Sequence, residues 1–252
     1  MRYSAQLHST KKHHILKHRW LSGLVSWAWI ILILAILSLV INFSQLSGRE
    51  IFNGFVASLI RTTIAYLIAA AAAIIVALII TSHKVIEDLL LPIFDVLQSF
   101  PSFALFPVLV VALKNSPETV IISVLTITMI WPILFSIIGG MKNRRIDFEE
   151  AATIFGARGA KRLWNYTIPE LMPSIVTGSI VGWGEGWEFI IGAELLVHAN
   201  VGIGTYLGKL GQNQENLALA FGIAILLLLL YILNKILWLP LLNRVTNYST
   251  EG

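Results

Sequence analysis

Residues 147–173 read DFEEAATIFGARGAKRLWNYTIPELMP and form the longest polar stretch between two long apolar ones. Asp147 can cap a helix that begins at Phe148, and Glu150, three residues after the cap, can bond back to the N–H of the cap residue. Acidic residues in the first turn also suit the positive end of the helix dipole. Gly156 is placed to end the helix in the left-handed conformation. The first half of the stretch therefore predicts a short helix that closes at this glycine.

The second half of the stretch predicts another short helix. It is expected from about Gly159 until Pro169, because proline lacks the backbone N–H of an interior turn and its ring clashes with the turn before it. The residue before a proline also disfavours the helical conformation. The two helices should meet at a glycine corner and lie on a membrane surface.

The composition places the chain among membrane proteins. Of its 252 residues, 56% are hydrophobic and 13% charged, and the mean hydropathy of +0.78 is too high for a soluble domain of this size. We expect an all-α fold, a polytopic membrane helical bundle. The sequence holds no cysteine, which excludes disulfides and thiolate metal sites. Its positive charges lie in loops between apolar spans, which fits anionic lipid better than nucleic acid.

Apolar segments predict about six transmembrane helices. The spans are expected at residues 24–43, 55–81, 91–113, 119–140, 171–192 and from about 216 to 238. The first is too long for the core of a signal peptide, so we expect an uncleaved anchor. Pro92, Pro101 and Pro107 predict a kinked or broken third span. Residues 1–20 should form a basic cytoplasmic tail and residues 21–252 the transmembrane domain, with its core at 55–238 and the polar loop at 141–170.

The distribution of lysine and arginine predicts the orientation of the bundle. If the N-terminus is inside, the inner segments hold 14 Lys and Arg residues, whereas the outer loops hold only Arg49, Lys114 and Lys209. Positive charge is retained on the cytoplasmic side of membrane proteins. Both termini and the polar loop are therefore expected in the cytoplasm.

The polar loop resembles the EAA loop of bacterial ABC importer permeases. In that family Glu-Ala-Ala is followed by three residues, Gly, nine residues, Ile, one residue and Leu-Pro. The residues at the pattern's positions here include Glu150, Ala151, Ala152, Gly156, Ile168 and Pro169. Tyr166 and Ile168 stand where the pattern has Ile and Leu, so the two departures are aromatic or apolar exchanges.

The resemblance implies a transport subunit that works in an assembly. The EAA loop would be the coupling helix that fits a groove on an ABC ATPase subunit, and the ATPase rather than this chain would use ATP. With one EAA loop per chain, two permease halves are implied, either a homodimer or a heterodimer with a related permease. A soluble extracytoplasmic substrate-binding protein would deliver the solute.

Three further stretches resemble the nitrate/sulfonate/taurine group of these permeases. They are LQSFPSFALFPVLV at 97–110, the pattern of Ser58, Leu59, Arg61 and Thr62, and Ala193-Glu194 followed by Val-Gly-Ile-Gly at 201–204. The resemblance implies a small oxyanion such as sulfonate, nitrate or bicarbonate as cargo. The tryptophan-rich fifth span departs from the group, and an amino-acid derivative or a pyrimidine precursor is the alternative cargo.

Charged residues inside the spans need partners or water. Arg61 in the second span either reaches the outer interface or pairs with Glu185 or Glu188 of the fifth span. Gln98 and Ser99, beside the expected break in the third span, are polar candidates for the solute path. Trp183 and Trp187 flank the two acids. We expect these rings to pack in the bundle or to anchor at the membrane interface rather than to line the solute path.

Two stripes of small residues predict close helix packing. The fifth span carries Ser174, Gly178, Gly182 and Gly186 at every fourth position, and the second span carries Ala65, Ala69, Ala73 and Ala77 at the same spacing. We expect the glycine stripe at a helix interface, within the chain or between subunits. The alanine stripe either packs likewise or faces lipid.

Several functions are disfavoured by what the sequence does not contain. There is no G-x-x-x-x-G-K-[ST] motif for ATP, and no H-E-x-x-H or G-x-S-x-G motif, so we expect no enzyme and no cofactor bound by the chain. His13, His14 and His18 have a spacing that could hold a metal, but no carboxylate or cysteine accompanies them. His198 and Glu194 could form an acid/base pair, but a surface contact of His198 is the favoured interpretation. An ion-coupled transporter that uses Arg61 and Glu185 is the remaining rival.

Overall fold

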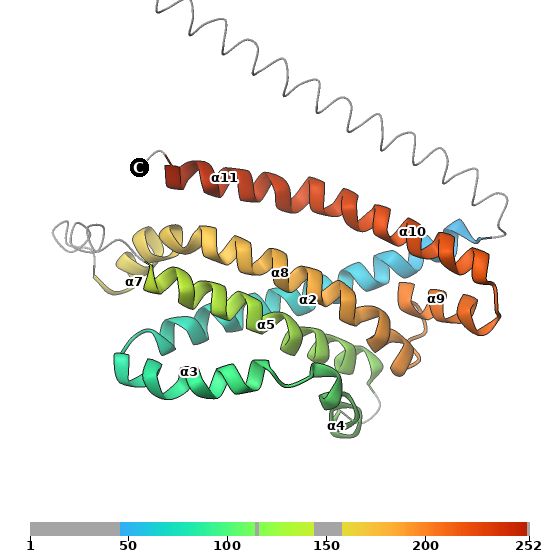
Figure 1. The fold of residues 1–252 in the computed structure, drawn as a ribbon, viewed down its shortest axis with the longest axis horizontal. Helices are drawn as coiled ribbons and strands as arrows, with labels where there is room; N and C mark the ends of the chain where they lie inside the picture. The colour runs from blue at the N-terminus through green and yellow to red at the C-terminus, as the bar shows by residue number, and fades with distance from the viewer. Residues whose placement is uncertain (1–45, 114–115, 144–157, 251–252) are drawn as a thin grey trace, which may run out of the picture.

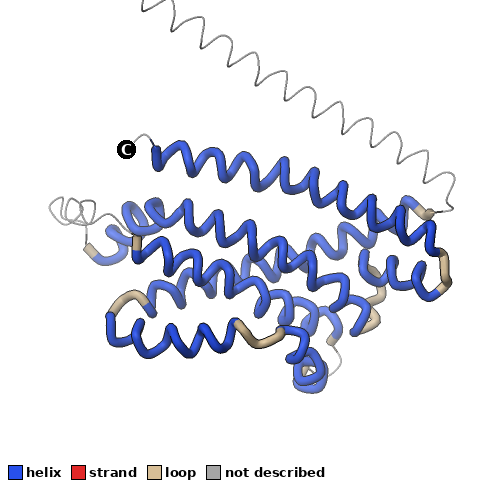
Figure 2. The backbone as a smooth tube through the Cα atoms, in the orientation of Figure 1, coloured by secondary structure: helices blue, strands red, loops and turns tan. Residues whose placement is uncertain are grey.

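The computed structural model describes residues 46–113, 116–143 and 158–250, and every regular element in these ranges is helical. This confirms the predicted all-α class. In chain order the helices are α2 (Gly48–Ile80), α3 (Lys84–Gln98), α4 (Phe106–Ala112), α5 (Pro117–Lys142), α7 (Gly159–Arg162), α8 (Ile168–Leu196), α9 (Ile203–Gln212), α10 (Asn216–Leu233) and α11 (Leu239–Thr250). Figures 1 and 2 show the long helices lying roughly along one axis.

Three long helices, α2, α5 and α8, form the centre of the bundle. The alanine stripe of α2 is fully buried, at Ala65, Ala69, Ala73 and Ala77, so it packs inside the chain and does not face lipid. On α8, a Cβ at Gly178 would lie 2.9 Å from the Pro132 carbonyl oxygen, and a Cβ at Gly182 would lie 2.9 Å from the Met129 carbonyl oxygen. The backbones of α5 and α8 thus approach each other where side chains are smallest.

The third span is broken, as its prolines predict. α3 ends at Gln98, a 3-10 turn covers Ser102–Leu105, and α4 follows. The two halves are bent by 84°. α3 contains Pro92 yet remains helical across it.

Helix length and composition support part of the predicted span count. Among the described residues three helices could cross a membrane, Gly48–Ile80, Pro117–Lys142 and Asn216–Val245, with the bent α3–α4 pair as a possible fourth. α8 is long enough, at 29 residues, but it carries four glutamates and five glycines and is less apolar. The span expected at 24–43 lies outside the described residues.

The prediction that Pro169 stops a helix is wrong. α7 continues into a π-helical turn, Leu163–Thr167, which leads directly into α8 at Ile168. The N–H of Ile168 bonds to the carbonyl of Leu163, five residues back. The wider π-helical turn directly precedes Pro169, which lacks an N–H, so the helix passes the proline without ending.

Different helices lie at the two ends of the bundle. α7 and the end of α11 lie at one end, and α9 lies toward the other (Figure 1). The α7 end carries an ion pair between Lys142 and Glu87, with 2.8 Å between Nζ and Oε1, which ties the last turn of α5 to the first turn of α3. The residues on either side of the 144–157 segment therefore belong to this end.

Replacing Gly182 with leucine should prevent α5 and α8 from packing. The new side chain would begin 2.9 Å from the Met129 carbonyl oxygen, and overpacking of this kind costs on the order of 1–3 kcal/mol or more. Gly184→Leu is the matched control, because a Cβ there meets nothing within 4 Å. Folded yield and thermal unfolding in detergent should fall for Gly182→Leu only. Equal behaviour of both variants would contradict this packing.

Candidate functional site

A buried arginine joins three helices at the end of the bundle opposite α7. Arg61 of α2 binds Glu118 of α5 with two donors, Nε to Oε2 and Nη2 to Oε1, each at 2.6 Å. Its Nη1 donates to Glu194 of α8 at 2.7 Å and to the Val201 carbonyl at 2.6 Å. Fork-shaped pairing of this kind suits the planar guanidinium. Arg61, Glu118 and Glu194 are called the arginine cluster below.

Glu194 is the most enclosed member of the cluster. Its side chain is fully buried, and it accepts hydrogen bonds from Arg61, from Ser58 Oγ at 2.6 Å and from the N–H of Gly204 at 2.8 Å. Ser58 Oγ in turn accepts from the N–H of Ile203 at 3.0 Å. A buried carboxylate is tolerated only with such compensation. Glu118, by contrast, has 58% of its side chain exposed.

Glycines give this cluster its space. A Cβ at Gly202 would collide with the Glu194 carboxylate, and one at Gly54 would lie 3.0 Å from the backbone of Gly202. A Cβ at Gly204 would lie 2.5 Å from the Ile191 carbonyl oxygen. The need here is for close approach, because Gly202 has an extended backbone, with a φ of 173°. The turn after α8 therefore rests directly on α2.

The predicted pairing of Arg61 with Glu185 or Glu188 is wrong. Glu185 lies nine residues before Glu194, which at about 100° per residue places it on the opposite side of α8. Glu194 lies on the face that packs against α2 and α5, whereas Glu185 is half-buried and Glu188 exposed. With the other described residues, neither acid makes an ion pair.

The other polar candidates are exposed. Gln98 donates to the Asp95 carboxylate at 3.2 Å, and Ser99 Oγ donates to the Asp95 carbonyl at 2.9 Å. Both side chains therefore make hydrogen bonds to the last turn of α3. His198 is exposed, and Glu194 is occupied by Arg61, so the acid/base pairing of His198 with Glu194 is not formed.

The two tryptophans are core residues. Trp187 stacks on Phe55 at 5.3 Å between ring centroids, and Trp183 meets Tyr66 at 5.5 Å and Trp238 at 5.8 Å. Trp183 and Trp187 are only 7% and 5% exposed. Within the described chain they therefore pack in the core and do not line a path. These rings connect α8 with α2 and with the π-helical turn Asn234–Trp238.

Most of the predicted coupling residues lie outside the described part of the chain. Glu150, Ala151, Ala152 and Gly156 fall within 144–157. Ile168 and Pro169 open α8, the first half-buried and the second exposed.

Sequence reasoning missed the roles of Ser58, Glu118 and Glu194, although the sequence carried a signal for Glu194. Arg61 continues the alanine stripe of α2 by one step of four, and Glu194 lies two such steps beyond Gly186. Residues on buried stripes share a face, so a charge on each stripe was a candidate pair. Ser58 and Glu194 also belong to the stretches that carry the group resemblance. Glu118 had no comparable signal beyond its place in a first helical turn.

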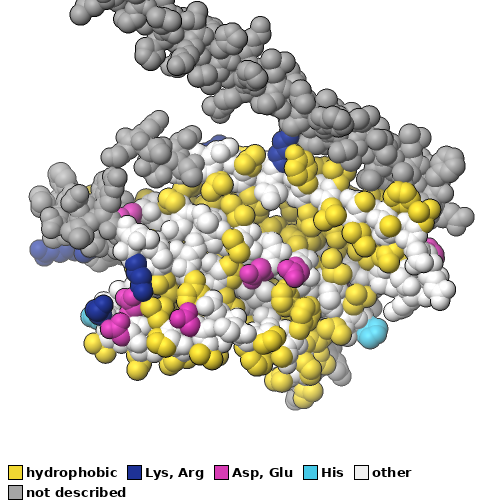
Figure 3. Space-filling view, in the orientation of Figure 1, with side chains coloured by type: hydrophobic (Ala, Val, Ile, Leu, Met, Phe, Trp, Pro, Cys, Tyr) yellow, Lys and Arg dark blue, Asp and Glu magenta, His cyan; other side chains and the backbone are white. Residues whose placement is uncertain are grey.

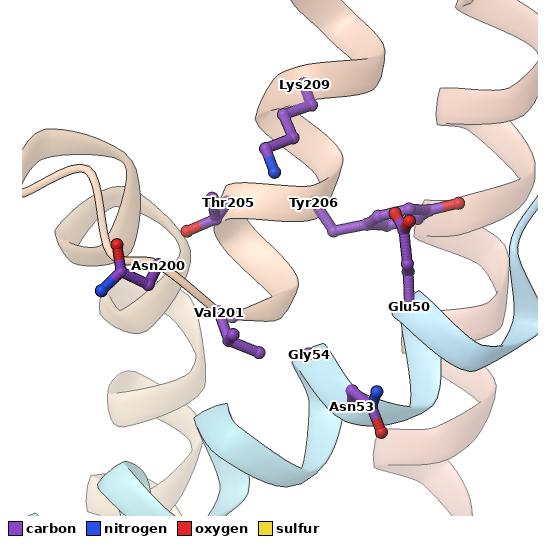
Figure 4. A pocket seen from close by; sticks show the side chains of 9 residues that line it. Glu50, Asn53, Gly54, Asn200, Val201, Thr205, Tyr206 and Lys209 are labelled. Atoms are coloured by element: carbon purple, nitrogen blue, oxygen red, sulfur yellow. The ribbon is translucent and has the colours of Figure 1, made fainter.

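A polar depression of about 210 Å³ adjoins the cluster. It lies between the start of α2 and the turn that leads into α9 (Figure 4). Its polar lining comes from Glu50, Asn53, Asn200, Thr205, Tyr206 and Lys209. Burial raises the pKa of the Tyr206 hydroxyl. Among the described residues, no three His, Cys, Asp or Glu side chains are grouped as metal ligands.

Truncating the two acids of the cluster should have unequal effects on stability. Glu194→Ala leaves Arg61 buried beside an empty site, and breaking a buried pair costs about 3–5 kcal/mol. Glu118→Ala removes a largely exposed partner, for which about 1 kcal/mol is expected. Unfolding in detergent, with Glu188→Ala as the unpaired control, measures both. Equal losses for the two variants would contradict the different burial of these carboxylates.

Comparison with known proteins identifies the family. Residues 69–239 match the family described as binding-protein-dependent transport system inner membrane component. This region includes Glu118, Glu194 and residues 150–169, which match the EAA pattern and are called the EAA segment below. Arg61 and Ser58 lie just before the matched region. The match confirms the resemblance to ABC importer permeases.

Curated relatives place the chain within a group. The nitrate import permease protein NrtB of Synechocystis sp. is 32% identical over 160 residues, 64% of this chain and 56% of NrtB. The bicarbonate transport system permease protein CmpB of Synechococcus elongatus is 30% identical over 166 residues, 66% of this chain and 59% of CmpB. The taurine transport system permease protein TauC of Escherichia coli is 28% identical over 177 residues, 70% of this chain and 64% of TauC. The chain spans less than two thirds of the length of these relatives. It belongs to the family of inner membrane components of binding-protein-dependent transport systems, a family of transport proteins and not of enzymes.

Proposed function

We propose that this chain is the transmembrane permease subunit of an ABC importer. The observation that carries the proposal is the family match over residues 69–239, which includes the whole EAA segment. The importer moves a small solute across the inner membrane of a bacterium or archaeon. Separate ABC ATPase subunits supply the energy, so the permease itself needs no nucleotide site.

The proposed assembly contains two permease copies. A homodimer is the simplest arrangement for a chain with one EAA segment, and a related permease could take the second place. An extracytoplasmic binding protein delivers the solute. The named substrates of NrtB, CmpB and TauC are nitrate, bicarbonate and taurine, which supports a small oxyanion or sulfonate as cargo, ahead of an amino-acid derivative or a pyrimidine precursor.

The orientation follows from charge. Five basic residues flank the turns at the α7 end of the bundle: Lys84, Lys142, Arg158, Lys161 and Arg162. Toward the opposite end, α2 carries Arg49 and α9 carries Lys209. We place the α7 end in the cytoplasm by the positive-inside rule. Six spans with both termini in the cytoplasm agree with this placement.

The packing of α5 and α8 supports a lever mechanism. α5 leads into the EAA segment and α8 follows it, and the two helices are joined along the glycine face of α8. Pushing of the ATPase dimer on the EAA segment would thus move α5 and α8 together. Glu118 and Glu194 lie at the far ends of these helices, so the movement reaches Arg61 and α2. We propose that this shift switches the bundle between its outward-open and inward-open states.

The solute path is proposed along the exposed side of α8. Glu185 and Glu188 lie along α8 away from its two ends, and they face away from α2 and α5. Figure 3 shows acidic side chains among hydrophobic ones on the face occupied by α5 and α8. Carboxylates at such positions avoid lipid and face water or protein. Gln98 and Ser99 are candidates at the break of the third span. Arg61 is buried in its cluster, so a joining role suits it better than solute contact.

Co-purification tests the coupling role of the EAA segment. Tagged permease from its native membrane should bring an ATPase subunit with it, and Glu150→Arg or Gly156→Leu should abolish this. Asp88→Arg is the matched control, since Asp88 is an exposed acid near the same end of the bundle. A wild-type chain that arrives alone and moves solute without ATP would favour the ion-coupled transporter instead.

Uptake measurements test the path. If the cargo is anionic, Glu185 and Glu188 raise its electrostatic barrier, so changing both to glutamine should increase uptake by about threefold or more. Labelled nitrate and taurine in proteoliposomes with the ATPase are suitable probes. Glu215→Gln, an exposed acid of the α9–α10 turn, is the control. Unchanged uptake of a transported anion would remove these residues from the path.

A further inference from the structure

We propose that the polar depression beside the arginine cluster is the docking point for a loop of the importer's extracytoplasmic binding protein. This inference rests on the proposed function. It adds a location, a chemistry of recognition and a route by which docking reaches the permease core.

The first observation is the unpaired charge in the depression. Glu50 is supplied by the first turn of α2 and Lys209 by α9, and the two side chains border the same space (Figure 4). Neither makes an ion pair with another described residue, and both are exposed. The carboxamides of Asn53 and Asn200 add donors and acceptors around them. A surface of this kind recognises a partner loop that carries one acidic and one basic side chain.

The second observation is the size of the depression. Pockets for drug-sized molecules measure about 300–1,000 Å³, and this one holds about 210 Å³. It admits one or two side chains at the tip of a loop. It also lies at the end that the positive-inside rule places outside the cell, where the binding protein arrives.

The third observation is the connection to the arginine cluster. Val201 and Gly202 form part of the depression. The Val201 carbonyl accepts directly from Arg61 at 2.6 Å, and Gly202 lies against the Glu194 carboxylate and the backbone at Gly54. Movement of this wall by a docked loop therefore alters the bonds of Arg61 to α5 and α8. Docking and the state of the bundle are coupled through one side chain.

The test uses the whole importer, permease with ATPase, in nanodiscs and its own purified binding protein loaded with solute. ATP hydrolysis is measured against binding-protein concentration. Lys209→Glu and Glu50→Lys should each raise the half-maximal concentration by about tenfold or more and weaken its dependence on salt. Arg49→Glu is the matched control: the residue is the exposed neighbour of Glu50 and does not line the depression. It should stay within about twofold of wild type.

A charge-swapped double variant separates docking from a structural role. If Glu50 and Lys209 only stabilised each other, the double variant Glu50→Lys with Lys209→Glu would restore the wild-type concentration. Docking predicts that it stays impaired, because the partner loop is unchanged. Restoration, wild-type behaviour of both single variants, or an equal shift in Arg49→Glu would overturn the proposal. A preparation without a co-purified ATPase would instead overturn the proposed function.

Discussion

Close approach of helix backbones is the constraint on which the rest of the structure depends. In lipid, helices gain little from burying apolar side chains against one another, so small residues and hydrogen bonds decide which faces meet. Here α8 presents Gly178, Gly182 and Gly186, and α2 presents its alanine stripe. Each stripe continues toward the same end of the bundle into a charged residue, Glu194 or Arg61. The small residues bring the helices close enough for these two charges to be sealed from water together.

The arginine cluster lies where α5 begins and α8 ends, whereas in the sequence the EAA segment follows the last residue of α5 and leads into α8. α5 and α8 connect them, and the tight contact between these helices leaves little room for independent movement. At the α7 end of the bundle the Lys142–Glu87 pair connects α3 to these two helices. A transporter needs such a unit, because a push on one side of the membrane must change contacts on the other. Packed interfaces respond to a push by moving as bodies and not by gradual deformation.

Much of the architecture could be predicted from sequence, because the deciding signals are local. Apolar length predicted the helices, and prolines predicted the break in the third span. Pro169 failed as a stop signal because the helix passes it by way of a π-helical turn, Leu163–Thr167, and no residue type marks such a turn. The prediction of the partners of Arg61 failed for another reason. Choosing among Glu185, Glu188 and Glu194 required knowing which face of α8 packs inward, and depth along the span alone does not distinguish them.

The length of α2 has a consequence for the depth of the arginine cluster. A helix of 33 residues rises about 50 Å, whereas the hydrocarbon core of a bilayer measures about 30 Å. With Ile80 at one boundary of the hydrocarbon core, the other boundary falls near Arg61. The cluster then lies at the level of the lipid headgroups, where an ionised side chain costs less free energy than at the midplane. A thicker bilayer would draw these charges into hydrocarbon, and a thinner one would expose them to water, so the balance of the bundle depends on the thickness of the membrane that holds it.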